Sequence, residues 1–371
     1  MNIRENVRSV IALSLIPSVG AQRIRQLLTI ADNADDIFKI PKQELMGLPG
    51  IGPGTASGIK SFNAWEQVDR ILEKSLRSGY QLITIDDPDY PARLKEIYDP
   101  PVLLWCLGNK KALNQDAISV IGTRNPSYYG RKTALNITGE LIDHGFCIIS
   151  GLAYGIDSIA HRVAVDRRSS TIAVLGSGLD RVYPTENIPL ANAIIEHGGA
   201  VITEFPPGTK PDAGNFPVRN RIVSGSSLGT IVIETANEGG SMITANLALE
   251  QNREVFVVPH PVNSPKGYGC NSLIKNGCGK LVQNVQDILD ELPFRIIEKH
   301  QGKASEPAWK SVSLTGAQKK VCTILDEYGI MHVDQISRIA NVPVNTLLGC
   351  LLELEISGCI RSISGKQFRL V

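Results

Sequence analysis

Short apolar runs alternate with helical patterns through the middle of the chain, from about residue 117 to residue 258. Six of these runs have the length of buried strands, and they span residues 118–121, 146–149, 171–175, 200–202, 230–233 and 255–258. One segment between them carries apolar residues along a single helical face: Ile156, Ile159, Ala160, Val163 and Ala164. Strands that alternate with helices predict a parallel sheet covered by helices on both faces, which is an α/β core.

Polar and small residues gather where the predicted strands end, and parallel sheets bind their ligands at that edge. Small residues at such turns expose backbone N–H groups that suit a phosphate, and arginines supply matching charge. The candidate residues of this kind are Gly122, Arg124, Ser150, Gly151, Gly155, Arg219, Asn220, Arg221, Gly240, Ser241 and Thr244. Together they predict a polyanion site at the carboxyl edge of the sheet.

Two familiar nucleotide motifs are missing from the sequence. The phosphate loop G-x-x-x-x-G-K-[ST] does not occur. The dinucleotide fingerprint also fails, because Arg181 stands where its third glycine belongs. ATP hydrolysis of the P-loop type and nicotinamide-dependent hydride transfer are therefore both disfavoured.

Four titratable residues near the same edge have a structural and a functional interpretation. His161 lies one turn into the helix after Ser150, and Asp157 occupies the first turn of that helix, where an acid suits the helix dipole. Glu204 and Glu234 close predicted strands, either as ordinary strand-end partners or as general acid-base groups. Both interpretations stay open for all four.

A short motif occurs twice in the first third of the chain. Ile16-Pro17-Ser18-Val19-Gly20 is followed 32 residues later by Leu48-Pro49-Gly50-Ile51-Gly52, and each copy precedes a short helical pattern. The apolar-Pro-x-apolar-Gly pattern predicts helix-hairpin-helix units, whose glycines let a phosphate approach the turn without base recognition. The second copy is the more specific one. DNA contact and simple helix packing are both open for this domain.

The helical pattern returns near the C-terminus. Three helices are expected at residues 317–328, 333–340 and 344–356, followed by strands at 360–363 and 368–371. This order predicts a winged helix. Its recognition helix would carry Glu353 and Glu355 but no lysine or arginine, so it would repel phosphates, while Arg361, Lys366 and Arg369 lie in the wing. We expect a partner-docking or accessory role rather than sequence-specific DNA reading.

The length of 371 residues exceeds the size at which one core stops growing, about 250–300 residues. We expect a helix-hairpin-helix domain at 1–78, an extended core at 79–297, a linker at 298–311 and a winged-helix domain at 312–371. With 38 basic and 37 acidic residues the formal net charge is +1, which excludes a uniformly basic nucleic-acid coat. Any polyanion site is therefore local.

Cysteine usage and hydropathy favour a cytoplasmic protein. The seven cysteines are odd in number and form no C-x-x-C pair, which favours free thiols over disulfides or a zinc site. No apolar stretch reaches the roughly 20 residues that span a bilayer. Residues 10–16 loosely resemble a signal peptide, but Glu5 interrupts the basic segment before them. We predict no metal site, no membrane span and no secretion.

A series of motifs runs in order through the core: Val120-Ile121-Gly122-Thr123-Arg124, Ser150-Gly151-Leu152-Ala153-Tyr154-Gly155-Ile156-Asp157, Ala160-His161, Thr171-Ile172-Ala173-Val174-Leu175-Gly176, Tyr183-Pro184, Phe216-Pro217-Val218-Arg219-Asn220-Arg221-Ile222 and Ser241-Met242-Ile243-Thr244-Ala245. The series resembles the DNA-processing protein A family, also called DprA or Smf, and covers about residues 117–280 densely. Two positions depart from the family pattern, His260 in place of a glycine and Gly239 in place of a serine. We expect them to alter loop geometry rather than to abolish binding.

The resemblance implies a Rossmann-like core with an N-terminal helix-hairpin-helix, or SAM-like, domain and a C-terminal winged-helix domain. It implies a bacterial cytoplasmic protein that binds single-stranded DNA and loads the recombinase RecA onto it during natural transformation or recombination. Such proteins dimerise through the α/β core, and the resemblance implies neither a cofactor nor catalytic residues.

The resemblance also implies roles for individual residues. On matching positions, Arg124 and the Ser150–Gly151 turn would line the strand pocket. The residues in or near the corresponding DNA-binding segment are Lys210, Phe216, Arg219 and Arg221. Phe216 would stack a base, with packing in the core as its alternative.

Two other functions stay open at this point. Rossmann-like phosphoribohydrolases also place a glycine-rich turn and carboxylates at strand ends, so Glu204 or Glu234 would act on a nucleoside monophosphate. Such enzymes usually lack flanking DNA-type domains. The alternative that the protein is a sequence-specific transcriptional regulator rests only on the predicted winged-helix domain. Glu353 and Glu355 in the recognition helix of that domain argue against it.

Overall fold

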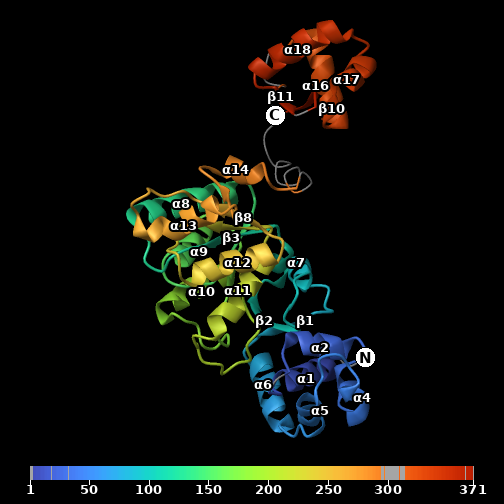
Figure 1. Ribbon diagram of the computed structural model, residues 1–371, viewed down its shortest axis with the longest axis vertical. Helices are drawn as coiled ribbons and strands as arrows, with labels where there is room; N and C mark the ends of the chain where they lie inside the picture. The colour runs from blue at the N-terminus through green and yellow to red at the C-terminus, as the bar shows by residue number, and fades with distance from the viewer. Residues whose placement is uncertain are drawn as a thin grey trace. The chain divides into compact units, whose positions relative to one another are not determined.

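The computed structural model describes residues 3–17, 19–31, 33–293, 296, 309, 314–363 and 365–370. The chain forms two compact units, residues 1–297 and residues 298–371, and each is described by itself (Figure 1). The linker predicted at 298–311 lies outside the described residues apart from Trp309. The predicted domain boundary near residue 78 falls inside the first unit and stays a prediction.

The first unit is built on one large sheet. Its nine strands within the described residues are β1 (Gln81–Thr84), β2 (Leu103–Gly108), β3 (Ala117–Ile121), β4 (Cys147–Ser150), β5 (Thr171–Val174), β6 (Ala200–Thr203), β7 (Gly229–Val232), β8 (Glu254–Val257) and β9 (Lys280–Leu281). The order is β1-β2-β6-β5-β4-β3-β7-β8-β9, with β1–β2 and β2–β6 antiparallel and the other neighbours parallel. The six predicted runs form β3 to β8, so the predicted parallel core is confirmed.

Helices cover both faces of the sheet. Consecutive strand residues point to opposite sides, so the apolar strands present side chains that must be buried on each face. One face carries α7 (Ala92–Lys95), α11 (Asn215–Gly225), α12 (Gly240–Glu250) and α13 (Tyr268–Lys275). The other face carries α8 (Tyr128–Asp143), α9 (Ile156–Asp166), α10 (Ile188–Glu196) and α14 (Val285–Leu289). Ile121 and Ile149 face the first set, whereas Val120 and Ile148 face the second. The strands from β3 to β8 therefore each contribute to two separate cores.

The strand order reverses at β3. The chain runs outward from β3 through β4, β5 and β6, then returns to place β7 on the other side of β3 and continues to β8 and β9. In open parallel sheets such a reversal leaves a crevice at the carboxyl ends of the two adjacent strands, and ligands bind there. The fold thus predicts a ligand site at the turns that follow β3 and β7.

The N-terminal segment is helical. It comprises α1 (Ile3–Ser14), α2 (Ala21–Leu28), α3 (Ala34–Ile37), α4 (Lys42–Met46), α5 (Pro53–Lys60) and α6 (Trp65–Arg77). Gly20 and Gly52, which end the two copies of the repeat, stand directly before α2 and α5, while Ser18 of the first copy lies outside the described residues. These helices share one apolar core with Leu103 and Trp105 of β2. DNA contact by the repeat stays a prediction.

The second unit is a small helical module with a three-stranded sheet. Its helices are α16 (Gly316–Tyr328), α17 (Val333–Ala340) and α18 (Val344–Ile356), and its strands are β10 (Met331–His332), β11 (Ile360–Ile363) and β12 (Gln367–Leu370). The strand order is β10-β12-β11. The three predicted helices and the terminal hairpin are confirmed, and β10 adds a strand that the sequence did not reveal.

All seven cysteines are free, and five of them are buried, which confirms the predicted free thiols. Among the described residues no single helix has both the length and the apolar character of a membrane span. α17 and α18 would qualify only as a pair, and that pair is bent by 108°.

Candidate functional site

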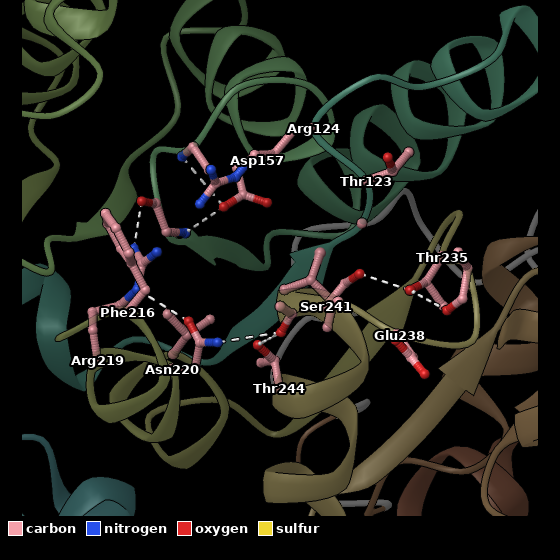
Figure 2. A pocket seen from close by; sticks show the side chains of 18 residues that line it. Thr123, Arg124, Asp157, Phe216, Arg219, Asn220, Thr235, Glu238, Ser241 and Thr244 are labelled. Carbon is pink, nitrogen blue, oxygen red and sulfur yellow. Dashed lines mark hydrogen bonds between the residues drawn. The ribbon is translucent and has the colours of Figure 1, made fainter. Parts of the chain in front are cut away.

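A pocket of about 340 Å³ opens at the switch point between β3 and β7 (Figure 2). Its walls come from the turns after β3, β4 and β7 and from α11 and α12. Of the residues predicted from the sequence, it brings together Gly122, Arg124, Gly151, Phe216, Arg219, Asn220, Gly240, Ser241 and Thr244. These residues come from segments that are distant in the chain, so the sheet topology assembles the site.

Two glycines let the turn after β3 pack directly against the start of α9. A Cβ on Gly122 would lie 2.6 Å from Cγ1 of Ile156, and a Cβ on Gly155 would lie 2.3 Å from the carbonyl oxygen of Thr123. Gly155 also adopts φ +78°, a left-handed conformation that favours glycine. This close packing holds the exposed Arg124 at the mouth of the pocket, although Gly155 does not itself line it.

The turn after β4 differs from the prediction. The N–H groups of Gly151 and Ala153 donate to Oδ2 of Asp157 at 3.2 and 3.3 Å, so they are not free for a phosphate. Ser150 is fully buried, and its hydroxyl donates to the Val120 carbonyl at 2.7 Å. The expectation that this turn offers open backbone donors is therefore wrong, and Asp157 acquires a role as the acceptor that fixes the turn.

Arg219 is the buried cation of the pocket. Its Nη1 donates to the carbonyl oxygens of Gly151 and Val174, and a Cβ on Gly151 would lie 2.3 Å from that nitrogen. Burial lowers the pKa of Arg219 to about 10, and burial also raises the pKa of Asp157, which faces it. Gly151 thus contributes space for a guanidinium rather than a phosphate-binding N–H.

Hydroxyl and amide groups form the wall opposite Arg124 (Figure 2). Ser241 and Thr235 share a hydrogen bond of 2.8 Å between their hydroxyls, and the Thr244 hydroxyl donates to the Gly240 carbonyl at 3.0 Å. Asn220 donates to the same carbonyl at 3.2 Å and accepts from Nε of Arg219 at 3.2 Å. This chain of contacts fixes α11 against the first turn of α12.

An aromatic ring forms another wall. Phe216 is half-buried and rests against Gly176, where a Cβ would lie 3.0 Å from the ring. The guanidinium carbon of Arg124 lies 5.6 Å from the centroid of the Phe216 ring, and the Tyr183 ring lies 5.9 Å away. The ring is therefore not part of the apolar core, and it presents a π-surface beside a cation.

Besides Ser150 and Gly155, two further predicted binding residues do not line the pocket. Arg221 points away into a buried ion pair, with Nη1 and Nη2 donating to the Glu204 carboxylate at 2.5 and 2.7 Å and Nε to Asp99 at 3.0 Å. Its side chain is only 7% exposed, so this guanidinium is occupied within the protein. Lys210 is exposed in the loop between β6 and α11 and does not line the pocket.

The residues weighed for acid-base chemistry also have structural partners. Glu234 is fully buried and accepts from the backbone and hydroxyl of Ser127, which caps α8. Neither Glu204 nor Glu234 lines the pocket. His161 is fully buried, and burial lowers its pKa to about 3. Because the Thr171 hydroxyl donates to the Ile148 carbonyl, Nδ1 of His161 donates to that hydroxyl at 2.8 Å.

The two residues that depart from the family pattern, Gly239 and His260, lie in different parts of the fold. Gly239 adopts φ +143°, a conformation that side chains rarely take, immediately before α12. His260 is buried with Nε2 3.5 Å from Glu234, and its ring meets Tyr129 edge-on at 5.1 Å. Only Gly239 lines the pocket.

Sequence reasoning missed several lining residues: Thr123, Ala153, Val223, Thr235, Ala236 and Glu238. Thr235, Ala236 and Glu238 follow β7 in the loop that leads to α12. The same signal that identified the other residues, position between a strand end and the next helix, would have found them. Among the described residues, the pocket therefore offers two arginines, two carboxylates, several hydroxyls and one aromatic face.

Comparisons with known proteins match most of the chain. The family model for DNA recombination-mediator protein A matches residues 81–293, and the one for the DprA winged helix domain matches residues 305–366. The DNA processing protein DprA of Streptococcus pneumoniae is 41% identical over 273 residues, covering 74% of this chain and 94% of that protein. Protein Smf of Escherichia coli is 37% identical over 306 residues, covering 81% of each.

Two solved structures share the fold. The X-ray structure of DprA from S. pneumoniae has a TM-score of 0.66 at 34% identity and covers 78% of this chain and 98% of its own. DNA processing protein A from Helicobacter pylori, a structure described for its single-stranded DNA binding mode, has a TM-score of 0.52 at 31% identity. That match covers 57% of this chain and 96% of the H. pylori chain.

Proposed function

This chain belongs to the DNA recombination-mediator protein A (DprA) family, and on that premise we propose that its core pocket binds single-stranded DNA. Family membership and the winged-helix domain confirm the resemblance inferred from the sequence. The H. pylori relative described for single-stranded DNA binding supports extending that activity to this chain.

One observation carries the proposal: the half-exposed Phe216 ring lies beside the Arg124 guanidinium at the mouth of a polar pocket. A base that stacks on an aromatic face needs no particular sequence, and an adjacent arginine holds its phosphate. A paired base inside a duplex has both faces covered, so it cannot use this wall. The pocket therefore favours an unpaired nucleotide.

The hydroxyl and amide wall supports the same ligand. The hydroxyls of Thr235, Ser241 and Thr244 donate their protons within the protein, so their oxygens remain to accept hydrogen bonds from the edge of a base. Arg219 supplies positive charge from below the turn after β4. Arg221 has no part in this proposal, because its guanidinium is taken up by Glu204 and Asp99.

Family membership extends the proposal beyond binding. We propose that the protein acts in the cytoplasm as a homodimer formed through the α/β core and delivers the bound strand to the recombinase RecA in transformation or recombination, without catalytic turnover. The engagement of Glu204 and Glu234 by structural partners disfavours the phosphoribohydrolase alternative in the form first considered.

For the winged-helix domain we propose an accessory role rather than DNA reading. α18 presents an exposed apolar row at helical spacing, formed by Val344, Leu348, Leu352 and Ile356. Its two acidic residues are engaged within the unit, Glu353 by Gln318 at 2.8 Å and Glu355 by Ser362 at 2.6 Å. An apolar and acidic helix does not match a phosphate-lined groove.

Fluorescence anisotropy of labelled dT20 and of a matching duplex, measured across a salt series, tests the DNA-binding proposal. Wild type is expected to prefer dT20, with an affinity that falls as salt rises, and Arg124→Glu to bind about tenfold more weakly or worse. Lys275→Glu is the control, since Lys275 ends α13 just before β9 and so lies at the opposite, amino edge of the sheet. Equal affinities of Arg124→Glu and wild type would refute the assignment.

A further inference from the structure

A second depression, the lateral groove, lies beside the pocket. It has a volume of about 600 Å³, and the residues of its lining that matter here are Arg124, Arg131, Tyr154, Arg162 and Glu186. Arg124 lines both the pocket and the lateral groove. An extended polymer that leaves the pocket past Arg124 therefore enters this groove directly.

Arg131 and Arg162, which line the lateral groove but not the pocket, project from neighbouring helices. Arg131 lies in the first turn of α8 and Arg162 in the second turn of α9, and both side chains are exposed. Because α8 follows β3 and α9 follows β4, their first turns lie at the same carboxyl edge of the sheet as the pocket. The fold thus extends the positive surface of Arg124 sideways.

The charges of these two arginines are not neutralised by any residue that the structure describes. Within the described parts of the chain, no carboxylate pairs with Arg131 or Arg162. At the other end of the same two helices the situation is reversed, since Arg167 forms an ion pair with Asp143. Arginines that serve only to join α8 and α9 would be expected to have such partners.

One carboxylate lines the groove, and it is occupied. Glu186 accepts hydrogen bonds from the hydroxyls of Tyr154 and Thr185, the latter at 3.2 Å. As far as the chain is described, the lateral groove therefore contains three guanidinium groups against a single carboxylate. That balance suits a polyanion rather than a cation or an apolar ligand.

We propose that the lateral groove is a second anion site in which Arg131 and Arg162 hold phosphodiester groups of the strand that flanks the nucleotide in the pocket. The proposal rests on the proposed function, since it needs a strand bound at Arg124. Arginine suits the task because its planar guanidinium forms paired hydrogen bonds with phosphate oxygens. The pocket would then hold one nucleotide while the groove sets the direction of the strand.

The test compares the double variant Arg131→Gln/Arg162→Gln with the control Lys111→Gln/Lys275→Gln in the full-length protein. Both pairs remove two exposed positive charges, but Lys111 precedes β3 and Lys275 precedes β9, so the control charges lie at the amino edge. Dissociation constants for dT20 are measured from 50 to 400 mM NaCl. A thermal melt checks that each variant is folded.

Each single-strand phosphate contact contributes about −0.7 to the slope of log K against log [salt], so losing two makes the slope less steep by about 1.4. We expect that change in the double variant and the wild-type slope in the control. A wild-type slope in the double variant, or equal changes in both, would overturn the groove while leaving the pocket intact. Failure of the wild type itself to bind dT20 would instead overturn the proposed function and the groove with it.

Discussion

Arg219 and Arg221 flank one asparagine, yet their surroundings give them opposite roles. Arg219 turns toward the pocket and is held by the carbonyl oxygens of Gly151 and Val174. Arg221 lies two positions further along α11, about 200° around the helix, and reaches Glu204 and Asp99. Sequence reasoning placed both in the binding site because neither acid is adjacent in the chain. Only the folded chain brings Asp99 and Arg221 together.

The buried ion pair leads to a stability prediction. Removing one partner of a buried pair leaves an uncompensated charge, so Arg221→Ala is expected to lower the free energy of unfolding by about 3–5 kcal/mol, measured with urea. Replacing both partners, as in Arg221→Met/Glu204→Met, is expected to cost much less. The salt slope for dT20 should stay at its wild-type value in the folded double variant. A stable Arg221→Ala protein that has lost DNA affinity would show that Arg221 contacts the strand instead.

His161 predicts a pH dependence of stability. Burial lowers its pKa in the folded protein to about 3, against about 6.5 when unfolded. Between these values the unfolded chain binds a proton that the native state excludes, so stability falls as the pH falls below about 6.5. The expected loss from this residue is about 2 kcal/mol between pH 7.5 and pH 5.

The variant His161→Asn isolates this contribution, because its amide can still donate to Thr171. The free energy of unfolding of both proteins is measured with urea at pH 7.5 and at pH 5. Between these values the wild type should lose about 2 kcal/mol more of this free energy than the variant. Equal losses would mean that His161 does not control the acid sensitivity.

At the scale of elements, hydrophobic patterning located the core strands to within about one residue, because buried parallel strands are continuous apolar runs. The same patterning did not predict β1 and β2, which join the sheet in antiparallel fashion through contacts with β6. Pattern also could not reveal that Asp157 occupies the N–H groups after β4, since that depends on how α9 is placed. Local sequence therefore predicted the strand-end positions but not the direction in which each group points.

The accessory role proposed for the winged-helix domain predicts how its basic residues affect DNA affinity. Its basic residues Arg361 and Arg369 face one another across the β11–β12 pair, while α18 has no basic residue. If this domain is accessory, Arg361→Gln/Arg369→Gln leaves the affinity for dT20 and for duplex DNA within about twofold of wild type in anisotropy. A drop in duplex affinity that is larger than the drop for dT20 would indicate that the wing binds DNA directly.

For the first unit as a whole, the reversal of strand order at β3 explains why the site lies where it does. Residues from three separate turns and from two helices meet at one crevice because β3 and β7 are neighbours although they lie more than 100 residues apart. The lateral groove continues the same edge through α8 and α9. A binding site that is spread over one sheet edge suits an extended polyanion better than a compact metabolite.

Base stacking on Phe216 is the central claim, and the affinity of a series of Phe216 variants for dT20 tests it most directly. Phe216→Leu keeps an apolar side chain against Gly176 and Tyr183 but removes the π-face, whereas Phe216→Trp keeps an aromatic surface. Stacking predicts a loss of about 1–3 kcal/mol in binding free energy for both Phe216→Ala and Phe216→Leu, and affinity near wild type for Phe216→Trp. Wild-type affinity in the folded Phe216→Leu variant would contradict the account.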